Sequence, residues 1–142
     1  MTAPRKPLGL AWIGYATCAW TVLFAAPHVW WGLGIPLGFP GGEAGYQVFM
    51  SATWRIVYDW VVVFLSLTGF GVALALVRPW GRTLPQRPLQ VLAWMAFGVL
   101  TLRGAAGLVA DGLADPIWSP SFLLGGLLFG GLAWQAHRMV QG

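Results

Sequence analysis

Arg103 is the residue whose chemistry most needs explaining, because it lies inside an apolar stretch that is long enough to cross a bilayer. The stretch runs from Leu89 to Ala110 and contains no other charged residue. A guanidinium keeps its proton in proteins, and an arginine near mid-membrane costs at least ~2.5–3.5 kcal/mol on insertion scales. Such a side chain therefore faces a polar partner or a water-filled cavity rather than lipid.

Asp59 is the carboxylate that the spacing places at the depth of Arg103. It follows the outer end of its own apolar segment by about five residues, and Arg103 precedes the outer end of its segment by about seven. At 1.5 Å per residue, both lie roughly 7–10 Å below the outer boundary. We therefore predict an ion pair between Asp59 and Arg103.

Other arrangements of these charges are left open. Asp59 could pair with Arg55, one helical turn earlier, and Arg103 could extend outward toward Asp111 or a lipid phosphate. The polar residues could form a purely structural clamp, or a cavity that binds a ligand or relays protons. The spacing alone does not separate the clamp from the cavity.

Helical spacing gathers further polar residues on the same inward faces. Intervals of four, three and four residues place one stripe on the first apolar segment, made of Thr17, Thr21, Phe24 and His28. Asp59 shares a face with Ser66, and Arg103 shares one with Gly107 and Asp111. Because buried polar groups in a membrane bundle turn inward, these faces are expected to converge. The candidate ligand-binding residues are Arg103, Asp59, His28, Thr21, Asp111 and Glu43.

The sequence carries no catalytic signature. It has no nucleophile motif, phosphate loop or zinc helix. An acid–base pair of Asp59 and His28 is imaginable, but nothing positions a substrate. The histidines His28 and His137 belong to opposite ends of the bundle, and the single Cys18 excludes a disulfide within the chain. We expect no catalytic residue, metal or cofactor, and enzymatic activity is disfavoured but left open.

Composition indicates that lipid is the solvent for much of the chain. Of its 142 residues, 58% are hydrophobic and only 8% are charged, against roughly 25% in soluble domains. The net charge of +4 does not indicate nucleic-acid binding, because the basic residues lie at the ends of apolar segments and form no continuous stripe.

Four segments meet the length of ~20 apolar residues that a spanning helix needs, at about 8–26, 54–77, 89–110 and 120–140. Prolines and caps punctuate their ends: Pro7, Ser51 or Thr53, Pro79, Pro88 and the pair Ser119-Pro120. The first apolar run is too long for a cleaved signal peptide and lacks a small-x-small cleavage site, so we expect it to be retained. The fold class predicted is a single all-α domain, an antiparallel four-helix integral membrane bundle over 1–142.

The flanking cations predict the orientation of this bundle. If the helices alternate, one side holds Arg5, Lys6, Arg78, Arg82, Arg87 and Arg138, and the other holds Glu43, Asp111, Asp115 and Arg55. The positive-inside rule then places both termini in the cytoplasm. Seven arginines against one lysine resemble the coding bias of a GC-rich bacterium, so the predicted location is a bacterial plasma membrane.

Two other features bear on packing. The connection 27–53 is too long for a simple turn and too apolar for disorder, so we expect it to lie on the outer face as a lid. The fourth segment contains Gly126-x-x-x-Gly130, a small-residue face that permits close helix approach within the bundle or between copies.

Several strings together resemble a known family. They are His28-Val-Trp-Trp-Gly-Leu-Gly, Arg78-Pro-Trp-Gly-Arg-Thr-Leu-Pro, Leu102-Arg103-Gly104 and Ile117-Trp-Ser-Pro-Ser-Phe-Leu-Leu-Gly-Gly-Leu-Leu-Phe-Gly. Over most of its length the chain is similar to small four-span membrane proteins of actinobacteria that are described as a domain of unknown function. The resemblance implies a four-helix bacterial membrane protein and brings no catalytic residues.

Three functions are compatible with these features. The preferred one is a non-enzymatic accessory or interaction protein with an outward-facing polar core. The first alternative is a membrane enzyme, or a protein that binds a lipid or quinone in the outer-leaflet pocket. The second is an oligomeric permease for a small solute or ion. The partners expected are the bilayer, a second copy or another membrane protein, and no nucleic acid.

Overall fold

The computed structural model describes residues 11–141, and within this range all regular secondary structure is helical. The elements are α1 (Ala11–Gly32), α2 (Gly42–Met50), α3 (Thr53–Val77), η1 (Pro79–Thr83), α4 (Gln86–Asp111), η2 (Gly112–Ala114) and α5 (Trp118–Gln141). The four long helices correspond to the four predicted apolar segments. Arg5, Lys6 and Pro7, on which part of the orientation argument rests, lie outside the described residues.

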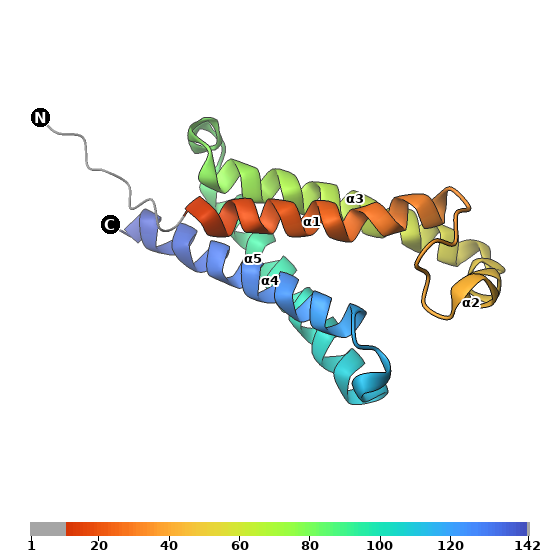
Figure 1. Cartoon of the computed structure of the whole chain (residues 1–142). Coiled ribbons are helices and arrows are strands. Elements are labelled where there is room, and N and C mark those ends of the chain that lie inside the picture. The colour runs from red at the N-terminus through yellow and green to blue at the C-terminus, as the bar shows by residue number, and fades with distance from the viewer. Residues whose placement is uncertain (1–10, 142) are drawn as a thin grey trace, which may run out of the picture.

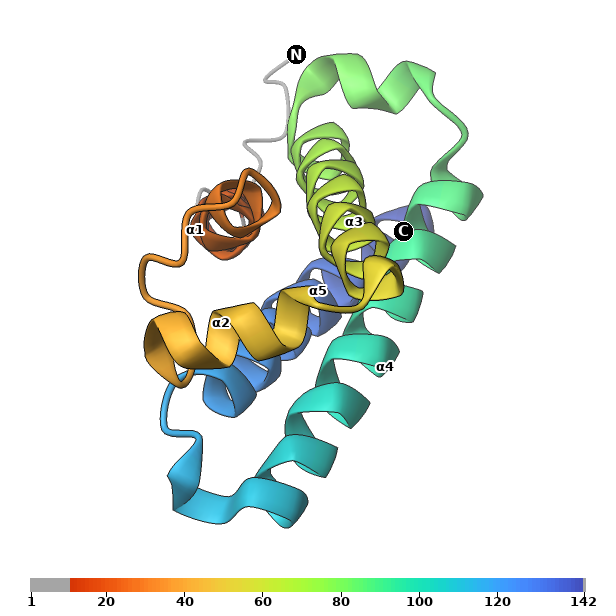
Figure 2. The ribbon, with the colours of Figure 1, turned by 90° about the vertical axis from the view of Figure 1, so that its right-hand side faces the viewer.

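The long helices associate as two pairs. α1 packs along α3, and α4 packs along α5, while contacts between the pairs are fewer (Figure 1). The pairs lie close together at the end that holds the C-terminus and diverge toward the turn between α4 and α5 (Figures 1 and 2). Side-chain hydrogen bonds join α5 to two of the other long helices: Trp20 Nε1 donates to the Ser121 carbonyl at 3.1 Å, and Gln90 Nε2 donates to that of Ala136 at 3.1 Å.

The core between the pairs is apolar and depends on small residues. Its buried members come from all four long helices and include Phe24, Ala73, Ala93 and Phe129. On α5, Gly126 lies directly against Thr101, and a side chain at Gly130 would meet Phe97 at 2.7 Å. The Gly126-x-x-x-Gly130 face therefore packs against α4 of the same chain. Of the two alternatives for this motif, contact within the bundle and contact between copies, the structure shows the first.

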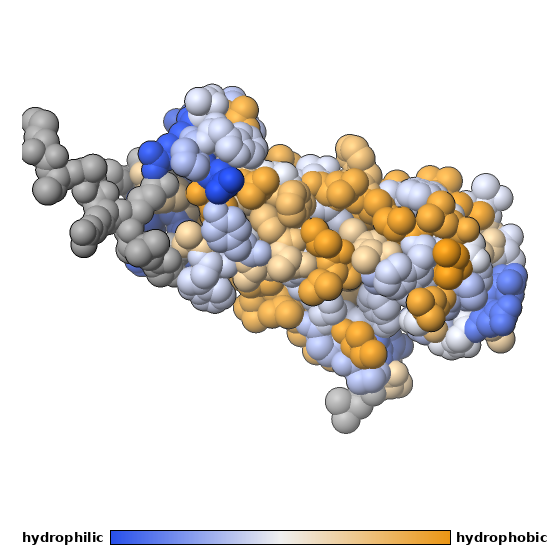
Figure 3. Space-filling model, turned by 45° about the horizontal axis from the view of Figure 1, so that its top comes forward, coloured by the Kyte–Doolittle hydropathy of each residue, from blue (hydrophilic) through white to orange (hydrophobic). Residues whose placement is uncertain are grey.

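Much of the outer surface is apolar. Figure 3 shows hydrophobic side chains over the middle of the long helices and more polar residues toward the ends. α3 and α4 are each long and apolar enough to cross a membrane. Only 28% and 17% of their most apolar windows are buried, which distinguishes them from the buried core helix of a soluble domain.

Several predicted helix boundaries were wrong. α1 continues through Pro27 to Gly32, so His28 lies inside the helix rather than after it. The connection after α1 contains a further helix, α2, which the sequence pattern did not indicate. Neither Ser51 nor Thr53 caps α3, because its N-cap position is Ala52.

The segment from residue 33 to 50 folds over the end of α1. The indole N–H groups of Trp30 and Trp31 both donate to the Leu37 carbonyl at 2.9 Å. Tyr46 Oη donates to the Trp31 carbonyl at 2.8 Å, and Phe39 packs edge-on against Trp31. These contacts hold the segment in one place, and we call residues 33–50 the roof.

Asp115, rather than Ser119, caps α5. Its carboxylate accepts hydrogen bonds from the backbone N–H groups of Trp118 at 2.9 Å and Ser119 at 3.0 Å, and from the Ser119 hydroxyl at 2.8 Å. Burial alone would raise the pKa of Asp115, but these hydrogen bonds and one from the backbone of Ile117 lower it below its ordinary value. The sequence suggested Ser119 as a cap followed by N1 proline at Pro120, whereas the helix begins two residues earlier, at Trp118.

Replacing Asp115 with alanine is expected to destabilise the folded chain by about 1 kcal/mol at neutral pH, because the first turn of α5 loses its acceptor. The folded-state pKa of Asp115 is lowered. Its contribution is therefore complete above the unfolded-state pKa of about 3.9 and is lost as the pH falls through the folded value. In detergent, the melting temperature of Asp115→Ala should lie below that of the unsubstituted protein at neutral pH. The difference between the two melting temperatures should be smaller at about pH 2.5.

Asp111→Ala is the matched control for this prediction. Asp111 is an exposed carboxylate at the C-terminal end of α4, where a negative charge is unfavourable to the helix dipole. Its removal should leave the melting temperature unchanged or slightly higher. A melting temperature of Asp115→Ala equal to that of the unsubstituted protein at neutral pH would contradict the capping role.

Candidate functional site

A buried hydrogen bond joins α1 to α3 near the roof. His28 Nδ1 donates to Asp59 Oδ1 at 2.7 Å. His28 is 8% exposed and Asp59 2% exposed, so this polar pair is shielded from its surroundings. His28 belongs to the last two turns of α1 and Asp59 to the second turn of α3. The two turns are adjacent because α1 packs along α3.

The pair leaves two buried polar atoms without a partner. Neither His28 Nε2 nor Asp59 Oδ2 has a hydrogen-bond partner among the described residues. Aromatic rings surround the imidazole, with ring centroids of Trp31 at 5.0 Å and Phe24 at 5.2 Å. Leaving a buried donor or acceptor unpaired costs about 1–3 kcal/mol, so a ligand that bonds to these atoms would be stabilised there.

A cavity of about 160 Å³ adjoins this pair, and we call it the polar chamber. Helices α1, α3, α4 and α5 and the roof all contribute to its walls. The lining residues are His28, Trp31, Phe39, Pro40, Phe49, Tyr58, Asp59, Arg103, Trp118 and Phe122. The predicted convergence of His28, Asp59 and Arg103 on one cavity is therefore present.

The predicted ion pair between Asp59 and Arg103 was wrong. Asp59 bonds to His28, because the extension of α1 through Pro27 carries the imidazole to it. α4 diverges from α3 toward this end (Figure 2), and within residues 11–141 Arg103 forms no ion pair. Its guanidinium carbon lies 5.0 Å from the centroid of the Phe122 ring.

Among the described residues, the pairings of Asp59 with Arg55 and of Arg103 with Asp111 are also absent. Arg55 donates to the carbonyls of Val48 at 3.2 Å and Phe49 at 3.3 Å rather than to Asp59. Its guanidinium also lies over the Phe49 ring, at 5.1 Å from the centroid. Arg55 therefore fastens the roof to the start of α3.

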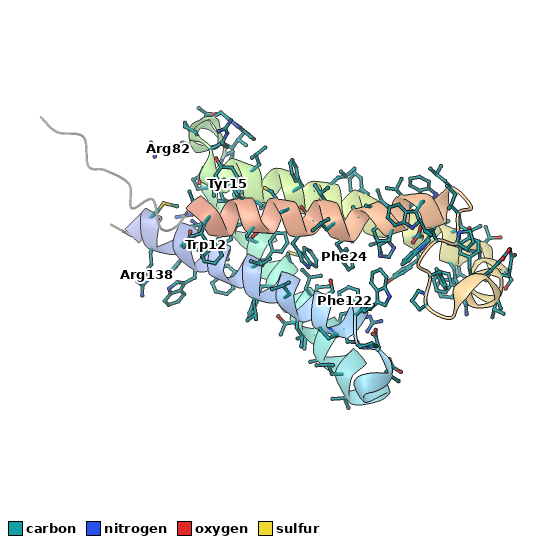
Figure 4. The ribbon with its side chains drawn as sticks, in the orientation of Figure 1. Trp12, Tyr15, Phe24, Arg82, Phe122 and Arg138 are labelled. Carbon is teal, nitrogen blue, oxygen red and sulfur yellow. The ribbon has the colours of Figure 1, made fainter. Side chains whose placement is uncertain are left out.

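An elongated apolar groove of about 400 Å³ runs between the two helix pairs, and we call it the apolar groove. Its walls come from α1, α3, α4 and α5 and include Trp20, Phe24, Leu65, Val99 and Phe129. Figure 4 shows Phe24 and Phe122 near each other between α1 and α5, and their ring centroids are 5.0 Å apart.

The groove and the chamber share three lining residues, Tyr58, Arg103 and Phe122. Arg103 therefore lies where the groove adjoins a chamber lined by His28, Asp59 and aromatic side chains. The surface of the groove is almost wholly hydrocarbon, with Thr21, Tyr58, Ser66 and Thr68 as its hydroxyl residues. Thr21 and Ser66 bond within their own helices, to the carbonyls of Cys18 and Val62.

The remaining candidate residues lie away from the chamber. Thr21 lines the groove instead. Glu43 is exposed in the first turn of α2, and Asp111 is exposed at the end of α4. Within the described residues no three His, Cys, Asp or Glu side chains form a group that could hold a metal ion.

Sequence reasoning missed the aromatic walls of the chamber. Trp31 lies one helical turn after His28 and so shares its face, and Trp118 is the first residue of α5. Tyr58 precedes Asp59 directly and gave no periodic signal of its own.

Comparison with protein-family models, curated proteins and solved structures finds no match to this chain.

Removing one member of the His28–Asp59 pair is expected to destabilise the fold by about 3–5 kcal/mol, because the other is left buried without its partner. Replacing both with leucine should cost less than either single change, since two apolar side chains need no partner. Chemical unfolding of His28→Leu, Asp59→Leu and the double variant in detergent measures this coupling.

Ser66→Ala is the control for the comparison of the two single variants with the double variant. Ser66 is buried on the same face of α3, but its hydroxyl bonds only to the Val62 carbonyl of its own helix at 2.8 Å. Its loss should cost no more than about 1 kcal/mol. If the double variant is as unstable as the sum of the two single variants, the pair is not energetically coupled.

Proposed function

We propose that this chain is a multi-pass membrane protein that binds one amphiphile from the outer leaflet. The hydrocarbon chain of the ligand lies in the apolar groove and its polar head in the polar chamber. The observation that carries the proposal is that the two spaces adjoin at Arg103, which lines both of them. An apolar pocket with a few convergent polar groups is the usual form of a small-molecule site.

The membrane part of the proposal includes all four long helices. α3 and α4 satisfy the requirements of length and composition. α1 and α5 have 22 and 24 residues, which at 1.5 Å per residue matches the ~30 Å hydrocarbon core. The positive-inside rule supports cytoplasmic termini and an outward-facing chamber. Membership of the actinobacterial four-span family is part of the same proposal.

The contrast between the two spaces supports an amphiphile over a small polar solute. A solute without a hydrocarbon chain would leave the groove unused, and a pure hydrocarbon would leave the atoms of His28 and Asp59 without partners. The accessory role and the permease stay predictions, and catalytic turnover forms no part of the proposal. A quinone or lipid ligand was the alternative that the sequence suggested, and the geometry favours it over the accessory role.

Cysteine labelling in intact bacterial cells tests the topology. On a Cys18→Ala background, Glu43→Cys on α2 and Thr83→Cys in η1 introduce thiols at exposed positions on opposite sides of the proposed membrane. A membrane-impermeant maleimide should label the first in intact cells and the second only after permeabilisation. The reverse pattern would place the chamber on the cytoplasmic side.

A pair of valine substitutions on α4 tests the groove. Val99 lines it at 64% exposure, whereas Val91 is 56% exposed and outside it. Native mass spectrometry of protein purified in mild detergent should show one retained lipid-sized ligand. Val99→Trp should lose that ligand because the indole fills the groove, and Val91→Trp should keep it. Equal retention by both variants would refute binding in the groove.

A further inference from the structure

We infer that the ligand head is an oxyanion, a carboxylate or phosphate, and that Arg103 selects it. This inference rests on the proposed function, since it names the chemical class of the molecule in the same site. Free fatty acids and acidic phospholipids both supply such a head on an apolar chain. Neutral quinones, esters and alcohols do not.

The state of Arg103 is the first argument. Asp59 is held by His28, so no carboxylate of the described residues neutralises the guanidinium. An unpaired arginine among hydrocarbon is expensive, and an anion at the chamber would compensate it. The guanidinium presents five N–H donors in a planar fork that matches carboxylate and phosphate oxygens in pairs. A single carbonyl or hydroxyl uses only part of this fork.

The second argument is the aromatic contact of the guanidinium, since the Arg103 side chain is otherwise exposed. One face lies over the Phe122 ring, with 5.0 Å from its central carbon to the ring centroid. On its other contact, Gly107 lies one helical turn later, and a methyl group there would be 2.9 Å from Arg103 Nη1. A side chain at Gly107 would come closest to Ser119 Oγ, so glycine at this position leaves room for that hydroxyl and for the guanidinium beside it. The contact with Phe122 favours one orientation of the guanidinium before a ligand binds.

His28 completes the charge balance. With Asp59 ionised, Nδ1 donates to its carboxylate, and Nε2 is an acceptor when the ring carries one hydrogen. A carboxylic acid that binds with its proton can pass it to Nε2, which leaves a carboxylate beside Arg103 and an imidazolium bonded to Asp59. For such a ligand the sum of the charges on ligand, His28, Asp59 and Arg103 is zero before and after this transfer. A buried site with no net charge avoids the desolvation cost of an isolated ion.

Native mass spectrometry titrations of the full chain in mild detergent test the inference with four probes. Oleic acid and dioleoyl phosphatidic acid are the two oxyanion sources, methyl oleate is the neutral counterpart, and inorganic phosphate lacks a chain. The tighter of the two acids is expected to bind about tenfold or more tightly than methyl oleate, because hydrogen bonds to charged groups exceed neutral ones by that order. Whichever acid binds more tightly shows whether the head group of the ligand is a carboxylate or a lipid phosphate.

Arginine variants assign the selectivity. Arg103→Leu should bring the affinity for the acid down to that for methyl oleate and leave the ester unchanged, whereas Arg103→Lys should keep part of the preference. Arg87→Leu is the control, since Arg87 is an exposed arginine at the opposite end of α4. Should Arg103→Leu fail to fold, as judged by its melting temperature, Arg103→Gln removes the charge with a smaller change in polarity.

The outcomes separate the inference from the proposal beneath it. Equal affinity for acid and ester would overturn the oxyanion head while leaving binding in the groove intact. If neither oleic acid, phosphatidic acid nor methyl oleate binds, the proposed function itself is wrong. Binding of inorganic phosphate as tight as that of the acids would show a free anion as the ligand. A dimer without ligand would assign the groove to a second copy of the chain.

Discussion

The hydrogen bond between His28 and Asp59 is the interaction on which the arrangement of the site depends. It joins α1 to α3 in a shielded layer and removes the carboxylate that Arg103 would otherwise meet. The bond also fixes which imidazole nitrogen carries hydrogen, so the two ring nitrogens have different chemistry. The guanidinium of Arg103 on α4 and the Nε2 acceptor of His28 on α1 therefore line the same chamber.

The divergence of the two helix pairs gives this local chemistry its surroundings. Small residues let the helices approach closely, Gly126 within the α4–α5 pair and Ala73 and Ala93 in the core. Toward the roof, aromatic side chains that include Trp31, Trp118 and Phe122 line the chamber without filling it. Close packing of small residues and an open space between large ones thus occur in the same bundle.

The sequence allowed the helical fold to be predicted in most respects, because apolar segments with flanking prolines are a strong local signal. It also led to Asp59 and Arg103 being assigned to one layer, since depth follows from the rise per residue, and to His28 being assigned to an inward-facing stripe of the first segment. The pairing within that layer could not be predicted. It depends on the continuation of α1 through Pro27, where a local rule favours termination, and on the angle between helix pairs, which no local pattern encodes.

The shared wall of groove and chamber has a consequence for how occupancy would be set under the proposed function. A ligand that arrives along the groove has already partitioned into the leaflet, so its head reaches Arg103 from the bilayer rather than through bulk water. Occupancy then follows the mole fraction of the ligand among the lipids of that leaflet. The protein would respond to membrane composition, and dilution of the surrounding aqueous phase would leave it unaffected.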